Sequence, residues 1–210
     1  MLNSGGGKMS DDQRKRVYFD FEFTGLTQQT TPISIGCITE DGAKFYAEFT
    51  DYDDSAIDDW LKSHVINNLL IKDSGVYRSK HDVGVKGHEQ IIRQELQKWL
   101  INTQEWEMWS DCLHYDWVLF CELFGGAMGV PSNIYYIPFD LSTVFKIKNI
   151  DPDINREFFA FGDKSPQDLA DIQSGFIKDV MSKQEDEQDV KHNALWDAYV
   201  IKKCVEKLKV

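Results

Sequence analysis

A chain of 210 residues, 42% of them hydrophobic, is long enough for one domain with a substantial core. Its formal net charge of −12 argues against a broad basic surface for duplex DNA, although acids that converge on metal ions remain compatible with a nucleic-acid enzyme. No apolar run approaches the roughly eighteen residues needed to span a bilayer, so no membrane partner is expected.

The N-terminal segment and the cysteines indicate how the chain is organised. Residues 1–16 lack the apolar centre of a signal peptide and start with a glycine-rich stretch, which predicts a flexible leader or tag remnant. Residues 17–210 are expected to form a single domain. The four cysteines form no CxxC pair and lie in apolar contexts, which predicts reduced core residues in a cytoplasmic protein. They are Cys37, Cys112, Cys121 and Cys204.

The first half of the chain is rich in β-prone residues. Strands are predicted at 17–23, 33–39 and 43–49, and an acidic-Gly connection at 40–42 is typical of a hairpin turn. One or two short helices are expected within 53–70.

The stretch 72–87 is expected to be a loop, because it carries three glycines and several basic residues. These are Lys72, Arg78, Lys80 and Lys86. Two interpretations stay open for this stretch: a solvated surface, or a segment that guides a phosphate backbone.

The second half of the chain alternates between helical and strand patterns. Helices are predicted at 89–100, 115–124, 139–145 and 193–208, and strands at 106–109 and 133–137. The polar stretch 151–189 is expected to be a loop. This order of elements predicts an α/β fold in which an antiparallel hairpin feeds a mixed sheet.

Two acids occur in the aromatic run 17–23. Alternate residues of a strand share a face, so Asp20 and Glu22 point the same way, and their Cα atoms lie roughly 7 Å apart. Charges in such a strand are costly unless they are paired or bound to a metal. The alternative is an edge strand with one solvated face.

A third acid, Asp116, lies at the head of a helix that is apolar nearly all round. Leu119, Phe120 and Leu123 share its stripe and mark that stripe as buried. Asp111 is the competing candidate, but it follows a strand, where a turn or capping role would suffice.

The fourth acid, Asp197, lies on the core side of the closing helix, for which Asn193 is a plausible N-cap. His192 precedes that helix and can reach the same site from the loop, although taken alone it is more typical of a surface histidine. His114 is the weaker candidate for a catalytic base, because it lies beside an apolar helix start.

Four carboxylates that converge from one strand and two helices suit two Mg²⁺ or Mn²⁺ ions, which prefer oxygen ligands. Two such ions can clamp the attacking and leaving oxygens of a phosphodiester. A neutral imidazole nearby can accept the proton of the attacking water, and His192 is the candidate for this role.

Three motifs carry a resemblance to the DEDD exonucleases. Asp20-Phe-Glu22-Phe-Thr-Gly25 resembles the first motif, and Tyr115-Asp116 resembles the second. His192-Asn-Ala-Leu-Trp-Asp197 resembles the third motif of the DEDDh branch. The segments 32–36 and 139–141 are similar to the RNase T-like 3′ exoribonucleases of bacteria and phages. The chain departs from the family at Asp111, where the second motif usually begins with Asn.

The resemblance implies a ribonuclease H-like fold, for which we expect a mixed five-stranded sheet flanked by helices. It implies that Asp20, Glu22, Asp116 and Asp197 hold two divalent cations and that His192 is the general base. It also implies that four residues after the first acids line the pocket for the terminal nucleotide. These are Phe23, Thr24, Gly25 and Leu26.

The expected activity is 3′-5′ hydrolysis of RNA, or of short single-stranded nucleic acid, to nucleoside 5′-monophosphates, and a homodimer is expected from the related enzymes. Two alternatives stay open. One is a DNA exonuclease of the same family, because the sequence reveals no residue that reads a 2′-hydroxyl. The other is a non-catalytic nucleic-acid-binding domain on the same fold.

Overall fold

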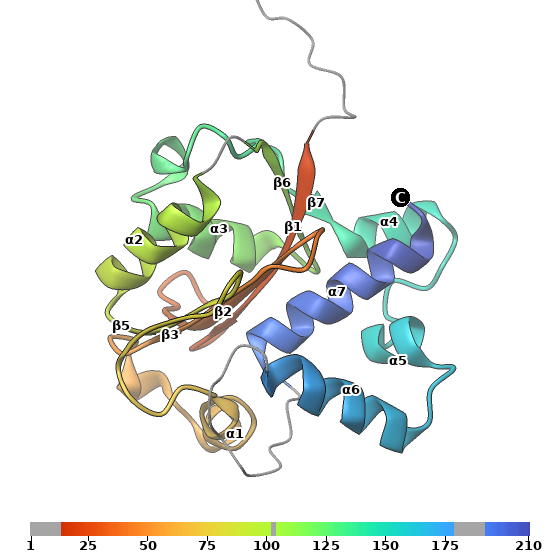
Figure 1. Ribbon diagram of the computed structural model, residues 1–210, viewed down its shortest axis with the longest axis horizontal. Helices are drawn as coiled ribbons and strands as arrows, with labels where there is room; N and C mark the ends of the chain where they lie inside the picture. Colours follow the sequence, from red (N-terminus) through yellow and green to blue (C-terminus); the bar gives the residue numbers. More distant parts are fainter. Residues whose placement is uncertain (1–13, 102–103, 179–191) are drawn as a thin grey trace, which may run out of the picture.

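The computed structural model describes residues 14–101, 104–178 and 192–210 (Figure 1). Residues 1–13 of the expected leader lie outside this range. Lys15 and Arg16, which we assigned to the leader, belong to the first strand. In the described part of the chain, none of the helices combines the length and the apolar character required to cross a membrane.

A mixed seven-stranded sheet forms the centre of the molecule, in the order β4-β5-β3-β2-β1-β6-β7. The strands are β1 Lys15–Phe23, β2 Pro32–Thr39, β3 Lys44–Phe49, β4 Gly75–Arg78, β5 Val83–Gly87, β6 Trp106–Ser110 and β7 Phe139–Asp140. The pairs β1–β2, β2–β3 and β4–β5 are antiparallel, and the pairs β1–β6, β3–β5 and β6–β7 are parallel. The α/β class and the mixed sheet are confirmed, whereas the expected count of five strands was wrong.

The stretch 72–87 is a hairpin rather than a loop. Its second strand, β5, pairs in parallel with β3 and in antiparallel with β4. Val83 and Val85 are buried in the core against helix α2 Glu89–Leu100. The glycines at 84 and 87 mask this strand in the sequence, because glycine has low strand propensity.

The segment 133–137 is not a strand. Its pairing with β6 is limited to one bridge between Trp106 and Ile134. Pro131 and Pro138 flank the segment and lack the N–H that a longer ladder would need. Phe139 and Asp140 instead continue the sheet as β7.

The stretch 151–178 forms helices rather than the expected loop. Asn155 caps α5 Arg156–Phe161 by accepting a hydrogen bond from the Phe158 N–H. Helix α6 Pro166–Lys178 packs Leu169, Ile172 and Phe176 toward the closing helix. The remainder of the predicted loop, 179–189, lies outside the described residues.

The other expected helices are confirmed within a few residues. They are α1 Asp59–His64, α2, α3 His114–Leu123, α4 Leu141–Ile147 and α7 Ala194–Leu208, with short 3₁₀ turns at η2 Asp54–Ala56, η3 Ile66–Asn68 and η4 Ala127–Gly129. Helices α2 and α3 cover one face of the sheet, and α7 lies across the other face with α4, α5 and α6 beside it (Figure 1).

Strand β1 lies between β2 and β6, which rules out the edge-strand interpretation of its two acids. Val17, Phe19 and Phe21 are buried on the side of α2 and α3. Tyr18 is buried on the opposite side, in the cluster that α7 completes. The alternation of the strand therefore turns Asp20 and Glu22 toward α7.

The expectation that all the cysteines are core residues was wrong for Cys112. Cys37, Cys121 and Cys204 are buried free thiols, but Cys112 is exposed. It follows β6 with φ of 52°, in a turn that leads to α3.

Candidate active site

Asp20, Glu22 and Asp197 form the centre of the site. Each carboxylate offers one oxygen atom, and these three oxygens lie within 4.8 Å of one another. Two of the acids come from the C-terminal half of β1 and the third from the first turn of α7. All three are partly buried, so they face one another at the boundary between sheet and helix.

A glycine allows α7 to approach the sheet at this point. Gly36 of β2 lies opposite Asp20 in the strand register. A Cβ atom at Gly36 would lie 2.3 Å from the carbonyl oxygen of Ala194 and from the backbone of Leu195. The absence of a side chain at Gly36 therefore lets the start of α7 bring Asp197 to the acids of β1.

Asp116 is the fourth acid and is buried in the first turn of α3. The Ser110 hydroxyl donates a hydrogen bond to its Oδ2 atom, and the Phe21 backbone N–H donates to the same carboxylate. Phe21 lies between the two acids of β1, so this contact ties Asp116 to that strand.

Burial raises the pKa values of all four acids, and the charges of neighbouring carboxylates raise them further, with Asp111 as that neighbour for Asp116. Burial raises the pKa of Asp20 well above its usual range, and among its neighbours Asp116 adds most. Burial raises the pKa of Asp116 to about 7, against the hydrogen bonds from Ser110 and Phe21, which lower it.

Glu22 and Asp197 share a hydrogen bond. Burial, followed by the charge of Asp116, raises the pKa of Glu22 to about 7, and the hydrogen bond lowers it. Burial and the charges of Glu22 and Glu157 raise the pKa of Asp197 well above its usual range. The pair therefore binds a proton more readily than two isolated carboxylates do, and a bound cation would compete with that proton.

Within the described ranges, no lysine or arginine forms an ion pair with any of the four acids. A cluster of carboxylates in this condition is unfavourable unless an external cation compensates its charge. Converging oxygen atoms are the ligands that Mg²⁺ and Mn²⁺ prefer, so the residues present fit divalent cations.

His192 lies in the turn immediately before α7, with φ of 59°. It is partly buried, and its ring meets the Trp60 ring edge-on at 5.4 Å and the His64 ring at 6.0 Å. Trp60 and His64 stack on each other within α1, at 4.8 Å. His192 is thus packed against α1 beside the helix that carries Asp197. His114, the alternative base, is exposed and contacts Tyr115.

The residues expected to bind the nucleotide follow β1 directly. Phe23 stacks on Tyr115, with 5.3 Å between the ring centres. Thr24 is buried, and its hydroxyl accepts a hydrogen bond from the Thr31 N–H at 2.9 Å. Gly25 donates its N–H to the Thr30 hydroxyl, which orders the turn. Leu26 is 75% exposed at the tip.

Asp111 serves a different purpose from the four acids. The Arg156 Nε atom lies 2.6 Å from its Oδ2 atom, and the Ser142 hydroxyl donates to its Oδ1 atom at 2.7 Å. Arg156 also donates to the Ser142 hydroxyl. Asp111 therefore connects the end of β6 to α4 and α5.

The sequence reasoning missed Arg156 and Glu157, because both fall in the stretch expected to be a loop. Glu157 accepts a hydrogen bond from the Trp196 indole N–H at 2.5 Å and raises the pKa of Asp197. The available signal was the aromatic run 158–161 after a capping Asn155, which is typical of a buried helix.

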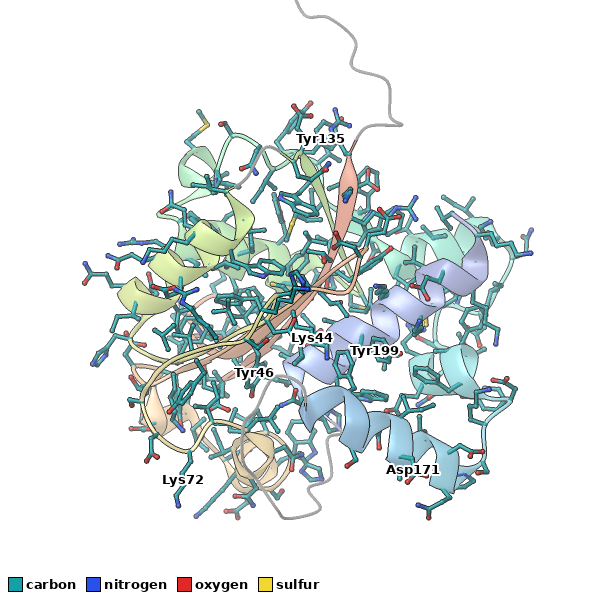
Figure 2. All side chains as sticks on the ribbon, in the orientation of Figure 1. Lys44, Tyr46, Lys72, Tyr135, Asp171 and Tyr199 are labelled. Carbon is teal, nitrogen blue, oxygen red and sulfur yellow. The ribbon has the colours of Figure 1, made fainter. Side chains whose placement is uncertain are left out.

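The basic residues of 72–87 do not act as one group. Arg78 pairs with Glu95, and Lys86 pairs with the buried Glu48 at 3.1 Å. Lys72 lies at the periphery of the molecule (Figure 2), and Lys80 is also exposed. A continuous phosphate-guiding surface is therefore not formed by these four side chains.

The mixed α/β fold and the carboxylate cluster, which could hold a metal ion, are compatible with a hydrolase, and the comparisons with known proteins identify the family. Residues 15–209 match the family described as the 3′-5′ exoribonuclease Rv2179c-like domain. The chain therefore belongs to that family.

Two relatives from Mycobacterium tuberculosis agree with this assignment. They are the 3′-5′ exoribonuclease MT2234.1 of strain CDC 1551 / Oshkosh and the 3′-5′ exoribonuclease Rv2179c of strain ATCC 25618 / H37Rv. Each is 31% identical over 121 residues, which cover 57% of this chain and 67% of the relative. The family and the relatives identify the chain as an exonuclease. They do not support the alternative of a non-catalytic nucleic-acid-binding domain.

Proposed function

We propose that this protein is a DEDDh-type, metal-dependent 3′-5′ exoribonuclease on a ribonuclease H-like fold, similar to the RNase T-like enzymes. In this proposal it hydrolyses phosphodiester bonds at the 3′ end of RNA and releases nucleoside 5′-monophosphates. The observation that carries the proposal is the convergence of Asp20, Glu22 and Asp197 within 4.8 Å. Asp116 lies close enough to raise the pKa values of both acids of β1.

Asp20, Glu22, Asp116 and Asp197 would hold two divalent cations, Mg²⁺ or Mn²⁺. When bound, such ions lower the pKa of water and stabilise negative charge on phosphate and leaving-group oxygens. The carboxylates supply the negative charge that keeps the cations in place, and Ser110 fixes the orientation of Asp116.

His192 is proposed as the general base. Its neutral imidazole would accept the proton of the attacking water, and its packing against Trp60 limits the orientations of the ring. His192 directly precedes the N-cap of α7, the helix that carries Asp197.

The turn 23–26 is proposed to hold the terminal nucleotide. The hydrogen bonds of Thr24 and Gly25 order the turn before substrate arrives, which reduces the entropy cost of binding. The exposed Leu26 offers an apolar surface for a base.

The proposal includes RNA as substrate, because the family and both relatives carry exoribonuclease in their names. It also includes a single domain, which begins with β1 at Lys15 rather than at residue 17, a cytoplasmic location and a homodimer. The four free cysteines are consistent with a reducing compartment.

The test uses 5′-labelled single-stranded RNA and DNA of the same sequence, with Mg²⁺, Mn²⁺ or EDTA. We expect stepwise shortening of RNA from the 3′ end, nucleoside 5′-monophosphates as products, and no reaction in EDTA. If DNA is shortened faster than RNA, DNA rather than RNA becomes the proposed substrate. Shortening that persists in EDTA would refute the metal-dependent mechanism.

A further inference from the structure

A buried polar network lies directly behind the turn that carries His192. Asn193 is 1% exposed, and Tyr46 and Glu48 of β3 are both 0% exposed. Tyr46 lies beside the first turn of α7, where it packs against Leu195 (Figure 2). Buried polar side chains of this kind are costly unless each one is fully hydrogen-bonded.

Asn193 uses all of its hydrogen-bonding capacity. Its Oδ1 atom accepts from the N–H groups of Leu195 at 3.1 Å and Trp196 at 3.4 Å, which caps α7. Its Nδ2 atom donates to the Tyr46 hydroxyl at 3.2 Å and to the Asn68 carbonyl oxygen at 3.1 Å. One side chain therefore caps the helix and also ties it to two other segments.

One partner of Asn193, Tyr46, is itself fixed by Glu48. The Tyr46 hydroxyl donates to Glu48 Oε1 at 3.0 Å, and the Ile71 N–H donates to the same oxygen at 2.7 Å. Lys86 forms an ion pair with Glu48 at 3.1 Å and donates to the Ile71 carbonyl oxygen at 2.6 Å. Glu48 therefore anchors the segment that follows η3 to strand β3.

The network also reaches the ring packed against His192. The Asn68 side chain donates to the His64 carbonyl oxygen at 2.6 Å, and the His64 ring contacts the His192 ring. His192 thus has its backbone fixed through Asn193 and its ring fixed through α1. His192 has a left-handed backbone, which is uncommon for a residue other than glycine, and the network holds the chain on its C-terminal side through Asn193.

We propose that Asn193 is a positioning residue for His192, and that Tyr46 and Glu48 hold the Asn193 amide in place. The proposal rests on the proposed function, in which His192 is the general base. Asn193 touches neither substrate nor the reacting water in this account. It sets the position of the imidazole, and small displacements of a catalytic group lower turnover more than substrate binding.

Substitutions at Asn193 and Tyr46 separate the positioning of His192 from the capping of α7. Asn193→Ser keeps an N-capping hydroxyl but removes both donors to Tyr46 and Asn68, whereas Asn193→Ala removes the cap as well. Tyr46→Phe removes only the hydroxyl that accepts from Asn193. Tyr18→Phe is the matched control, because Tyr18 is an equally buried tyrosine outside this network.

The measurements are kcat and KM on RNA, the affinity for Mn²⁺, the melting temperature, and the NMR contact between the His192 and Trp60 rings. For Asn193→Ser and Tyr46→Phe we expect kcat to fall roughly 10- to 100-fold with KM and Mn²⁺ affinity unchanged, and the ring contact to weaken. Tyr18→Phe should keep the wild-type kcat.

A wild-type kcat in both Asn193→Ser and Tyr46→Phe would overturn the proposal, as would an equal loss of kcat and Mn²⁺ affinity, which indicates general damage to the site. If the wild-type protein degrades no RNA, the proposed function fails on its own. The ring contact then still decides whether Asn193 positions His192.

Discussion

The molecule contains two kinds of buried acid, and they differ in how their charge is compensated. Asp111 and Glu48 each face a cation of the protein itself, Arg156 and Lys86. The four acids of the candidate active site have no such partner among the residues that the structure describes, and their pKa values are raised. The first kind is compensated within the fold, and the second kind costs stability that bound cations would recover in the proposed function.

The comparison predicts that the same Asp-to-Asn change has opposite effects on stability at Asp116, which has no ion-pair partner among the described residues, and at Asp111, which pairs with Arg156. Asp116→Asn removes a proposed metal ligand without breaking an ion pair. We expect turnover to fall by about 10³-fold or more, while the melting temperature of the metal-free protein stays the same or rises. Steady-state kinetics on labelled RNA and thermal unfolding in EDTA measure the two effects. Retained turnover would remove Asp116 from the site.

His192→Ala separates proton transfer from cation binding. We expect turnover to fall roughly 10²- to 10⁴-fold, the usual contribution of a general base, with Mn²⁺ affinity preserved because the acids are untouched. His114→Ala is the matched control and should behave like the wild type. If only His114→Ala loses turnover, His114 of α3 rather than His192 is the general base.

Asp111→Asn tests the compensated kind of acid. The ion pair with Arg156 and the hydrogen bond from Ser142 are both partly buried. Their loss should lower the free energy of unfolding by about 1–3 kcal/mol, measured by urea denaturation. Turnover should stay within about fivefold of the wild type. A loss of turnover as large as that of Asp116→Asn would place Asp111 in the catalytic machinery.

Leu26→Ala should have the smallest effect. Leu26 is 75% exposed, so its truncation removes little buried surface and should leave the melting temperature unchanged. If the side chain contacts the terminal base, KM should rise roughly 3- to 10-fold at constant kcat. An unchanged KM would remove Leu26 from the nucleotide pocket.

The sequence predicted the strands and helices whose hydrophobic pattern lies entirely within one element. The alternation in 17–23 turned Asp20 and Glu22 to one face, and the apolar stripe of 193–208 turned Asp197 toward the sheet, as observed. Both patterns depend only on residues within one element. The prediction of Asp116 at the head of a buried stripe succeeded for the same reason.

Features that depend on distant partners escaped the sequence reasoning. Strand β5 contains two glycines and is held by its pairing with β3. Helix α5 has a polar start, which is stabilised by Asp111, 45 residues earlier in the chain. The link between Asn193 and Tyr46 spans 147 residues, so neither residue alone signals it.

The most direct test of the uncompensated acids is the pH dependence of stability in the metal-free protein. Their unfolded pKa values lie near 4, and in the folded state the pKa values of Glu22 and Asp116 are about 7. The folded protein therefore binds more protons than the unfolded chain between these values, so this contribution to stability is present below about pH 4 and is lost as the pH rises through about 7.

The measurement is the free energy of unfolding at pH 5 and pH 8, with EDTA or saturating Mn²⁺, for the wild type and Asp116→Asn. We predict that the metal-free wild type loses more stability than Asp116→Asn between pH 5 and pH 8, and that Mn²⁺ stabilises the wild type more at pH 8. Identical pH dependence in the two proteins, together with no stabilisation by Mn²⁺, would contradict the account.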